Sequence, residues 1–572
     1  MQRLTGPAVL CAALMGLFAA PAHAAFEVTS FAVTPASTAA GAHADVTIAA
    51  GFPAYSAGNV PQRPRNLVFH LPPGLAGDPF ATPRCAEAAF RADSCPAATR
   101  IGGVAATADA VVLGLPVAQD VTGDLYNVVP SGAEPARLGA VLRPLGGLLG
   151  KFTVATTVSA RASDGGLDAT VRDLPTELNG LQVYTSKLSF TLQGRPGGKP
   201  FMRNPTSCRP AISTVDATPY GEPAAAVSRT SSFTPTSCGA LPFAPHITGT
   251  IGAKGQTAAR SHPPVTTVIT QGAEQAGQAA VTVTLPPVVG PDLNQLARAC
   301  PAERVAVATC PATARVGRVV ATTPLLAHPL TGDVFLAGGA RGALPGLGIQ
   351  LGPPIPLRLT GSVALTPQGI RTTFTGLPDV PLARFALSLD GGPTGLFSAG
   401  RDLCTLRTPP AVGAVYAAQS GKQTAETREL ARVGCTPRPA VSAKVWHVRS
   451  GRPVVRVSVT AAKAAPDLTE LRLLLPQRLA VKPRRKAQGA RVRTGAGRLP
   501  GGAFRLRGAG ELRVTLPGGT RTVTAKLSNG AVRATGKLRT ARKPKRLALR
   551  VLLRDGDGPR PTRTLRVRAQ RR

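Results

Sequence analysis

The chain has 572 residues, a net charge of +38 and an aromatic content of only 4%. The low aromatic content disfavours carbohydrate-binding modules, which present aromatic platforms to sugars. The 62 glycines and 55 prolines exclude long helices, because proline interrupts helical hydrogen bonding, and favour short strands joined by turns.

Residues 1–24 have the pattern of a secretory signal peptide. Arg3 precedes an apolar run, and small residues at 22 and 24 resemble a cleavage site. We therefore expect the mature chain to begin at Ala25 and to be secreted, remaining extracellular or at the cell surface. No later stretch approaches the ~20 apolar residues of a membrane-spanning helix, so no transmembrane segment is expected.

Eight cysteines follow, in two matching sets of four. The first two of each set are 10 residues apart, and the last two are 30 apart in one set and 31 in the other. The sets are Cys85, Cys95, Cys208 and Cys238, then Cys300, Cys310, Cys404 and Cys435. An exported chain favours disulfides, whereas zinc ligands usually come in pairs two to four residues apart. Each set allows three pairings, of which near neighbours are favoured because their separation is kept.

The sequence around the cysteines also repeats. SCPAATRIGG at 94–103 matches TCPATARVGR at 309–318, and TGDLYN at 122–127 matches TGDVFL at 331–336. LSFTLQG at 188–194 likewise matches FALSLDG at 385–391. We therefore predict two tandem four-cysteine modules, module 1 at 25–240 and module 2 at 241–435.

Short alternating or β-branched runs bounded by Gly or Pro predict strands in both modules. These runs are Asp45–Ile48, Leu67–Leu71, Lys151–Val158, Val183–Leu192, Ala280–Leu285 and Ile370–Thr375. Two brief helices are expected at Pro83–Phe90 and Pro291–Ala299, the second capped by Asp292. The fold class predicted is all-β, with tandem disulfide-linked modules that resemble β-sandwiches.

Residues 436–572 form a third predicted domain, with an immunoglobulin-like β-sandwich fold. Its strand candidates are Val454–Val459, Leu471–Leu475, Leu512–Leu516, Val523–Leu527, Leu547–Leu553 and Thr564–Val567. This segment holds 35 lysines and arginines against 5 aspartates and glutamates, so it carries +30 of the chain's +38.

This charge predicts attraction of polyanions. Candidate polyanion-binding residues are Lys482, Arg484, Arg485, Lys486, Arg542, Lys543, Lys545 and Arg546. An exported protein meets anionic envelope polymers and lipid surfaces before nucleic acid, which is not the expected physiological partner. The alternative is that the positive charge only reflects the amino-acid composition, and that the charged strand faces are solvated without binding a ligand.

Several motifs of residues 26–435 resemble a family of large secreted actinobacterial proteins. The motifs are STAAGAHADVTI at 37–48, LPPGLAGDP at 71–79, Cys85 with the CPAATRIG segment, Tyr126-Asn127, and NPTSC at 204–208. Module 2 is similar to the companion repeat of that family, with LPDVPLARFALSLDGGPTGLF leading to Cys404. It departs from the pattern where Pro264 replaces Asp45. The resemblance implies no activity, cofactor or ligand.

The histidines offer the few remaining candidates for chemistry. His43 and His262 recur at matching places, which favours a structural hydrogen bond more than a ligand, and the histidine spacings do not build a metal site. No catalytic motif is present, and we expect no catalytic residue, metal or cofactor. The leading hypothesis is a non-catalytic structural or binding protein of the envelope. A secreted hydrolase acting on an envelope polymer and a scaffold without a ligand are the alternatives.

Overall fold

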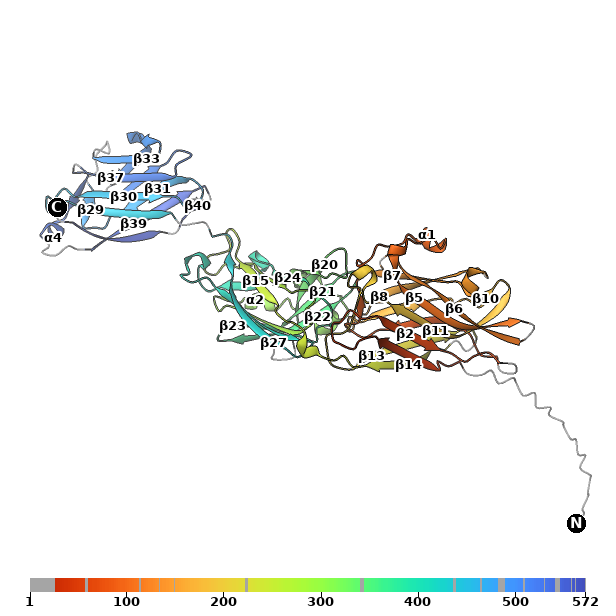
Figure 1. Cartoon of the computed structure of the whole chain (residues 1–572). Coiled ribbons are helices and arrows are strands. Elements are labelled where there is room, and N and C mark those ends of the chain that lie inside the picture. The colour runs from red at the N-terminus through yellow and green to blue at the C-terminus, as the bar shows by residue number, and fades with distance from the viewer. Residues whose placement is uncertain are drawn as a thin grey trace, which may run out of the picture. The chain divides into compact units, whose positions relative to one another are not determined.

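Alternating apolar and polar residues form strands along the chain of this computed structural model. It describes residues 26–570 apart from 57–59, 113–114, 133, 149, 222–224, 340–343, 436–438, 463–464, 482–488, 508–509, 529, 541–545, 557 and 561. The signal segment therefore lies outside the described residues. The chain forms two compact units, residues 1–434 and 435–572. The first contains both predicted modules, coloured red to cyan in Figure 1.

Module 1 is built on one antiparallel sheet with the strand order β1-β2-β11-β5-β6-β7-β8-β9-β3-β13-β14. Its strands are β1 (Ser30–Pro35), β2 (Val46–Gly51), β3 (Pro64–His70), β5 (Arg100–Val112), β6 (Leu115–Val128), β7 (Ala136–Leu142), β8 (Phe152–Ala160), β9 (Leu167–Val171), β11 (Leu181–Leu192), β13 (Ala211–Pro219) and β14 (Val227–Phe233), with β10 (Glu177–Leu178) beside β11. The sheet curls until its edges meet, since the Arg229 guanidinium donates to the Val28 carbonyl at 2.9 Å. The inward side chains form one core.

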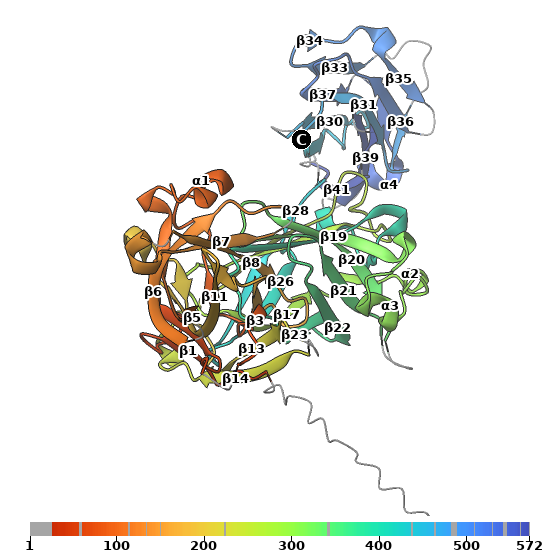
Figure 2. The ribbon, with the colours of Figure 1, turned by 90° about the vertical axis from the view of Figure 1, so that its right-hand side faces the viewer.

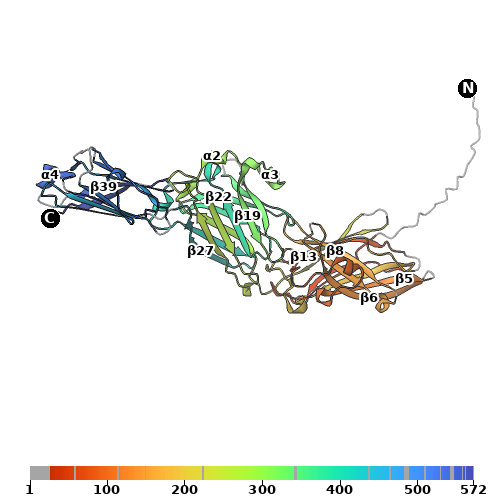
Figure 3. The ribbon, with the colours of Figure 1, turned by 90° about the horizontal axis from the view of Figure 1, so that it is seen from above.

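Module 2 repeats this topology strand for strand, in the order β15-β16-β24-β19-β20-β21-β22-β23-β17-β26-β27. Its strands are β15 (His246–Ile251), β16 (Val265–Thr270), β17 (Gln278–Leu285), β19 (Arg315–Thr322), β20 (Leu330–Ala337), β21 (Gly346–Leu351), β22 (Arg358–Thr366), β23 (Gly369–Thr375), β24 (Arg384–Leu389), β26 (Ala411–Ala418), β27 (Gln423–Glu429) and β28 (Ala431–Arg432). Figure 3 shows β19, β22 and β27 from above. The identical order means that each strand of this series in one module has an equivalent in the other.

The short elements are also duplicated. β4 (Ala76–Gly77) pairs with β12 (Met202–Arg203), as β18 (Val289–Pro291) pairs with β25 (Phe397–Ala399).

A glycine explains the shared RIGG and RVGR motifs. Both strands bulge just before it, and a Cβ added to Gly102 would lie 2.0 Å from the Thr191 carbonyl oxygen. The same substitution at Gly317 would bring a Cβ to 2.2 Å from the Ser388 carbonyl oxygen. No other residue fits at these two positions.

The helices differ in extent from the prediction. α1 (Glu87–Arg91) begins later than Pro83, because the backbone of Cys85 is extended and bonds to β6 through the Asn127 carbonyl at 2.8 Å. α2 (Leu293–Leu296) is shorter than predicted because Pro291 belongs to β18, but Asp292 caps it as expected, accepting from the Asn294 N–H at 3.0 Å. α3 (Ala302–Ala306) was not predicted.

The second unit is a two-sheet sandwich with the immunoglobulin-like order that was expected (Figure 2). One sheet has the order β29 (Ala440–Trp446), β30 (Val454–Thr460), β37 (Thr522–Leu527), β33 (Ala490–Thr494) and β34 (Gly497–Arg498). The other has the order β35 (Phe504–Arg507), β36 (Glu511–Thr515), β31 (Leu468–Leu474), β39 (Arg546–Asp555) and β40 (Gly558–Pro559), with β41 (Arg563–Arg568) also on β39. The remaining elements are β32 (Leu479–Val481), β38 (Val532–Ala534) and α4 (Gly536–Arg539). Strands β29-β30-β37-β33 and β31-β39-β41 follow the ABED and CFG orders of immunoglobulin domains, with β35 and β36 added.

Within the described residues, no helix is long and apolar enough to cross a membrane.

Candidate functional site

Three disulfides join near neighbours, as the repeated separations favoured. Cys85–Cys95, Cys208–Cys238 and Cys300–Cys310 are bonded, and Cys404 and Cys435 are also in disulfide linkage. The first and third occupy equivalent places, each beside the end of the strand that contains the repeated TGD motif. Disulfides of this kind restrict the unfolded chain and hold the segment before β5 or β19 in place.

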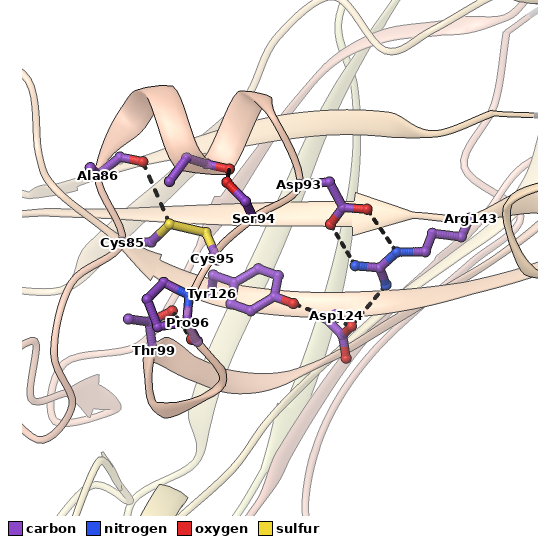
Figure 4. The surroundings of a disulfide bond; sticks show 11 residues. Cys85, Ala86, Asp93, Ser94, Cys95, Pro96, Thr99, Asp124, Tyr126 and Arg143 are labelled. Atoms are coloured by element: carbon purple, nitrogen blue, oxygen red, sulfur yellow. Dashed lines mark hydrogen bonds and ion pairs between the residues drawn. A yellow bond between two sulfur atoms is a disulfide. The ribbon is translucent and has the colours of Figure 1, made fainter.

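An ion-pair cluster beside the first disulfide is specific to module 1 (Figure 4). Arg143 binds Asp93 at 2.6 Å and Asp124 at 2.8 Å, and its hydrogen bonds to Asp93 and Asp124 raise its pKa above the usual value. In module 2 the positions of Asp93 and Arg143 are occupied by Ala308 and Gly352. The cluster therefore ties the cystine segment to β6 and β7 and is not part of the repeated design.

His43 and His262 both make structural contacts at the predicted equivalent places. His43 Nδ1 lies 2.7 Å from the Met202 carbonyl and Nε2 lies 3.1 Å from Glu274, whereas His262 Nε2 lies 2.9 Å from Asp292. Asp45 accepts from the Gly194 N–H at 2.7 Å. In module 2, Pro264 replaces Asp45 and packs against Gly391, the equivalent of Gly194. Asp45 therefore caps the end of a strand through a hydrogen bond, whereas Pro264 fills the equivalent place by packing. No group of three or more potential metal ligands gathers among the described residues.

His70 is held between two carboxylates on the outer face of module 1. Nδ1 lies 2.8 Å from Asp168 and Nε2 lies 3.0 Å from Asp216, and Asp168 also binds Arg161 at 2.6 Å. Burial opposes protonation, but the hydrogen bonds to both carboxylates outweigh it and raise the pKa of His70. Because both ring nitrogens are engaged, this imidazole has no free nitrogen for proton transfer.

A buried carboxylate joins the two modules inside the first unit. Asp379 of module 2 is 5% exposed and accepts from both the backbone N–H and the hydroxyl of Thr206, each at 2.6 Å. The Thr206 hydroxyl oxygen in turn accepts from the Gly277 N–H at 2.9 Å. Burial raises the pKa of Asp379, with the Thr206 hydrogen bonds opposing that shift. Arg203 reinforces the joint by donating to the Gln275 carbonyl at 2.7 Å.

Four cations stand side by side on one sheet of the second unit. In the register of β29, β30, β37 and β33, Lys444 lies opposite Arg456, Arg456 opposite Lys526, and Lys526 opposite Arg491. Directly opposed residues point to the same face, and here that face is outward. We call these four residues the cation row. Like charges in this position destabilise a sheet, so the row opposes folding unless an anion compensates it.

The other sheet carries a comparable row of three arginines, two of which are paired with glutamates. Arg505 lies opposite Arg513, and Arg513 lies opposite Arg472. Glu470 binds Arg513 at 2.6 Å and Glu511 binds Arg472 at 2.7 Å. We call Arg472 and Arg513, together with Glu511 and Glu470, the neutralised row.

The described carboxylates of the second unit all lie away from the cation row. Glu470 and Glu511 belong to the neutralised row, Asp467 lies 3.6 Å from Arg521, and Asp555 binds Arg560. The cation row is therefore left without a carboxylate among the described residues of its face, so it is free to attract an external anion.

The basic clusters singled out from the sequence fall mostly outside the described residues. Lys482, Arg484, Arg485, Lys486, Arg542, Lys543 and Lys545 lie there, whereas Arg546 opens β39, exposed and opposite Arg568. The cation row was missed, because its members come from four strands spread over residues 440–494 and 522–527. Each strand shows alternation, but only the pairing register brings the four side chains together.

Known proteins give little further guidance. No protein-family model and no curated protein matches the chain. Among solved structures, the chain is 12% identical to Escherichia coli alpha-2-macroglobulin activated by porcine elastase, covering 96% of this chain but only 45% of that one, with a TM-score of 0.20. It is 10% identical to the N-terminal domain of the Streptococcus gordonii adhesin Sgo0707, covering 86% and 95% of the two chains, with a TM-score of 0.18. It is 6% identical to the T6 backbone pilin of Streptococcus pyogenes, covering 70% of this chain and 67% of that one, with a TM-score of 0.18. These low scores carry no functional argument.

Proposed function

We propose that the protein is a non-catalytic, exported binding protein of the cell envelope, retained on anionic envelope polymers by its C-terminal unit. The cation row is the observation that carries this proposal. Strands in a sheet lie about 4.8 Å apart, so Lys444, Arg456, Lys526 and Arg491 present a regular line of positive charge. A linear polymer with repeated phosphate or carboxylate groups is the ligand that can follow such a line.

The disulfides and the predicted signal sequence support export of the chain. The disulfides of the modules need an oxidising compartment to form and persist. The predicted signal sequence gives the route. The basic clusters at 482–486 and 542–546 stay part of the proposal as additional contacts, because an anionic polymer longer than the row can reach more than one of them.

The experiment compares two variants of the full chain that lose equal charge. The first replaces the cation row with Lys444→Gln, Arg456→Gln, Arg491→Gln and Lys526→Gln. The control replaces four exposed arginines of the other sheet with Arg505→Gln, Arg550→Gln, Arg566→Gln and Arg568→Gln. Binding to a phosphate-backbone wall polymer and to heparin is measured at low salt.

The cation-row variant should bind both polyanions roughly 100 to 1,000 times more weakly, at about 1 kcal/mol for each basic side chain near an anionic surface. The control should keep most of the affinity, although its net charge is the same. Equal losses of affinity in both variants would mean that binding depends on net charge and not on the arrangement of the cation row. Failure of the unmodified chain to bind either polymer at low salt would defeat the proposal.

A further inference from the structure

Module 2, together with a few residues of module 1, surrounds a cavity of about 150 Å³ with an almost wholly apolar lining. Among the described residues that line it, none is charged, and the polar side chains are Thr267, Gln278 and Thr323. The amide of Gln278 already donates to Gln271 at 2.8 Å. A polar ligand would therefore lose its hydrogen bonds to water and gain few in return.

Module 1 fills the same region with aromatic rings. Phe69 and Phe190 pack edge to face with their ring centroids 6.0 Å apart, and Phe31 stacks on Phe69 at 6.2 Å. All three side chains are buried in the core. The module 1 cavity whose lining matches most of the module 2 lining, with Ala106, Leu142 and Phe190 among its residues, has a volume of only about 60 Å³.

The equivalent positions of module 2 hold smaller side chains. The shared topology and register place Val283 where module 1 has Phe69, Leu387 where it has Phe190, and Ile247 where it has Phe31. Val283 and Leu387 line the cavity and are only partly buried. At the positions of Val283 and Leu387, the cavity therefore occupies volume that aromatic rings fill in the other copy of the fold, while Phe374 and Phe385 line it elsewhere.

The cavity can be reached from solvent. Leu325, Ile355 and Leu382 line it from the loops that join strands at one end of the sheet, and each keeps part of its surface exposed. Six residues of module 1 line the same region, namely Gly74, Leu75, Ala76, Ala160, Gly165 and Leu167. An apolar group can thus enter between these loops while a polar end stays outside.

We propose that this cavity of module 2 is a binding site for a hydrocarbon group, either a free apolar molecule or the end of an acyl chain. An apolar cavity of about 150 Å³ stays dry and accepts a molecule of the size of benzene. Occupation restores the contacts that the lining side chains lose around an empty space. The site is independent of the cation row and of polyanion binding.

The test titrates the full chain with benzene and, separately, with octanoate, by isothermal calorimetry. Val283→Phe with Leu387→Phe rebuilds the rings of module 1 and should weaken binding of either probe at least tenfold. Leu387→Phe alone should weaken it to a lesser degree, and circular dichroism checks that each variant keeps its strands. The reverse change in module 1, Phe69→Val with Phe190→Leu, should add a second site.

Binding of octanoate would show that an acyl chain enters with its carboxylate at the mouth, and binding of benzene alone would identify a free hydrocarbon as the ligand. The inference is overturned if the unmodified chain binds neither probe. It is also overturned if a folded Leu387→Phe variant and a folded double variant bind as tightly as the unmodified chain.

Discussion

The tandem modules and the C-terminal unit use the same alternating strands but treat charge in opposite ways. In the modules, acidic residues accompany the basic ones, as in the Arg143 cluster with Asp93 and Asp124. In the C-terminal unit, the described carboxylates pair with other arginines and leave the cation row without a carboxylate partner. Because both regions have an apolar core, this difference does not arise from the fold. The comparison indicates that the inward-facing apolar residues stabilise both regions. Outward-facing charges without a carboxylate partner are the candidates for binding.

The modules should depend most on their disulfides. Replacing Cys208 and Cys238 by serine should lower the unfolding free energy of module 1 by about 2–5 kcal/mol, because the unfolded segment gains conformational freedom. Denaturant unfolding of the full chain, monitored by hydrogen exchange in each module, measures the loss. Module 2 serves as the internal control, and an equal loss in both modules would contradict their separate stabilisation.

The joint between the modules should come next in magnitude. Asp379→Ala removes both acceptors of Thr206 and leaves a buried N–H and hydroxyl unpaired, at a cost of about 1–3 kcal/mol. Thr176→Ala, at the equivalent position of module 1, should change stability by less than about 0.5 kcal/mol. Chemical denaturation of both variants tests the contrast. Similar values for the two would show that the joint contributes little.

The smallest effect expected is a pH dependence from His70, whose equivalent in module 2 is Thr284. The raised pKa of His70 means that its ion pairs with Asp168 and Asp216 stabilise module 1 fully at pH values below the unfolded pKa. This contribution, about 0.2–1 kcal/mol for a partly exposed pair, is lost as the pH rises through the folded pKa.

Stability measured between pH 5 and pH 8 should therefore fall more steeply for the parent chain than for His70→Thr, which introduces the residue found at the equivalent Thr284. Hydrogen exchange of β3 and β13 locates the effect. Identical pH profiles for the two proteins would refute the role given to His70.

Much of the fold could be predicted from the sequence, because strands and cystine pairs leave local patterns. Alternation located β30 and β37, and the matched gaps favoured the observed pairing of Cys85 with Cys95. Helix limits were less accessible, since the extended backbone at Cys85 depends on a bond to the distant β6.

The candidate sites were harder to predict, because they depend on register and on packing. Nothing near Asp379 indicates that it meets Thr206, which lies 173 residues away. The cation row likewise requires the pairing of β29 with β30 and of β37 with β33. The cavity depends on the register as well, because only the register shows that Val283 stands where module 1 has Phe69.

The salt dependence of polyanion binding tests the central claim most directly. A DNA duplex serves as the calibrated polyanion, because the log of affinity falls with the log of salt concentration by about 0.9 for each phosphate neutralised. The account predicts that replacing Lys444, Arg456, Arg491 and Lys526 reduces this slope by about 3–4, whereas replacing Arg505, Arg550, Arg566 and Arg568 leaves it nearly unchanged. Equal reductions in the two variants, or a slope that neither variant alters, would contradict it.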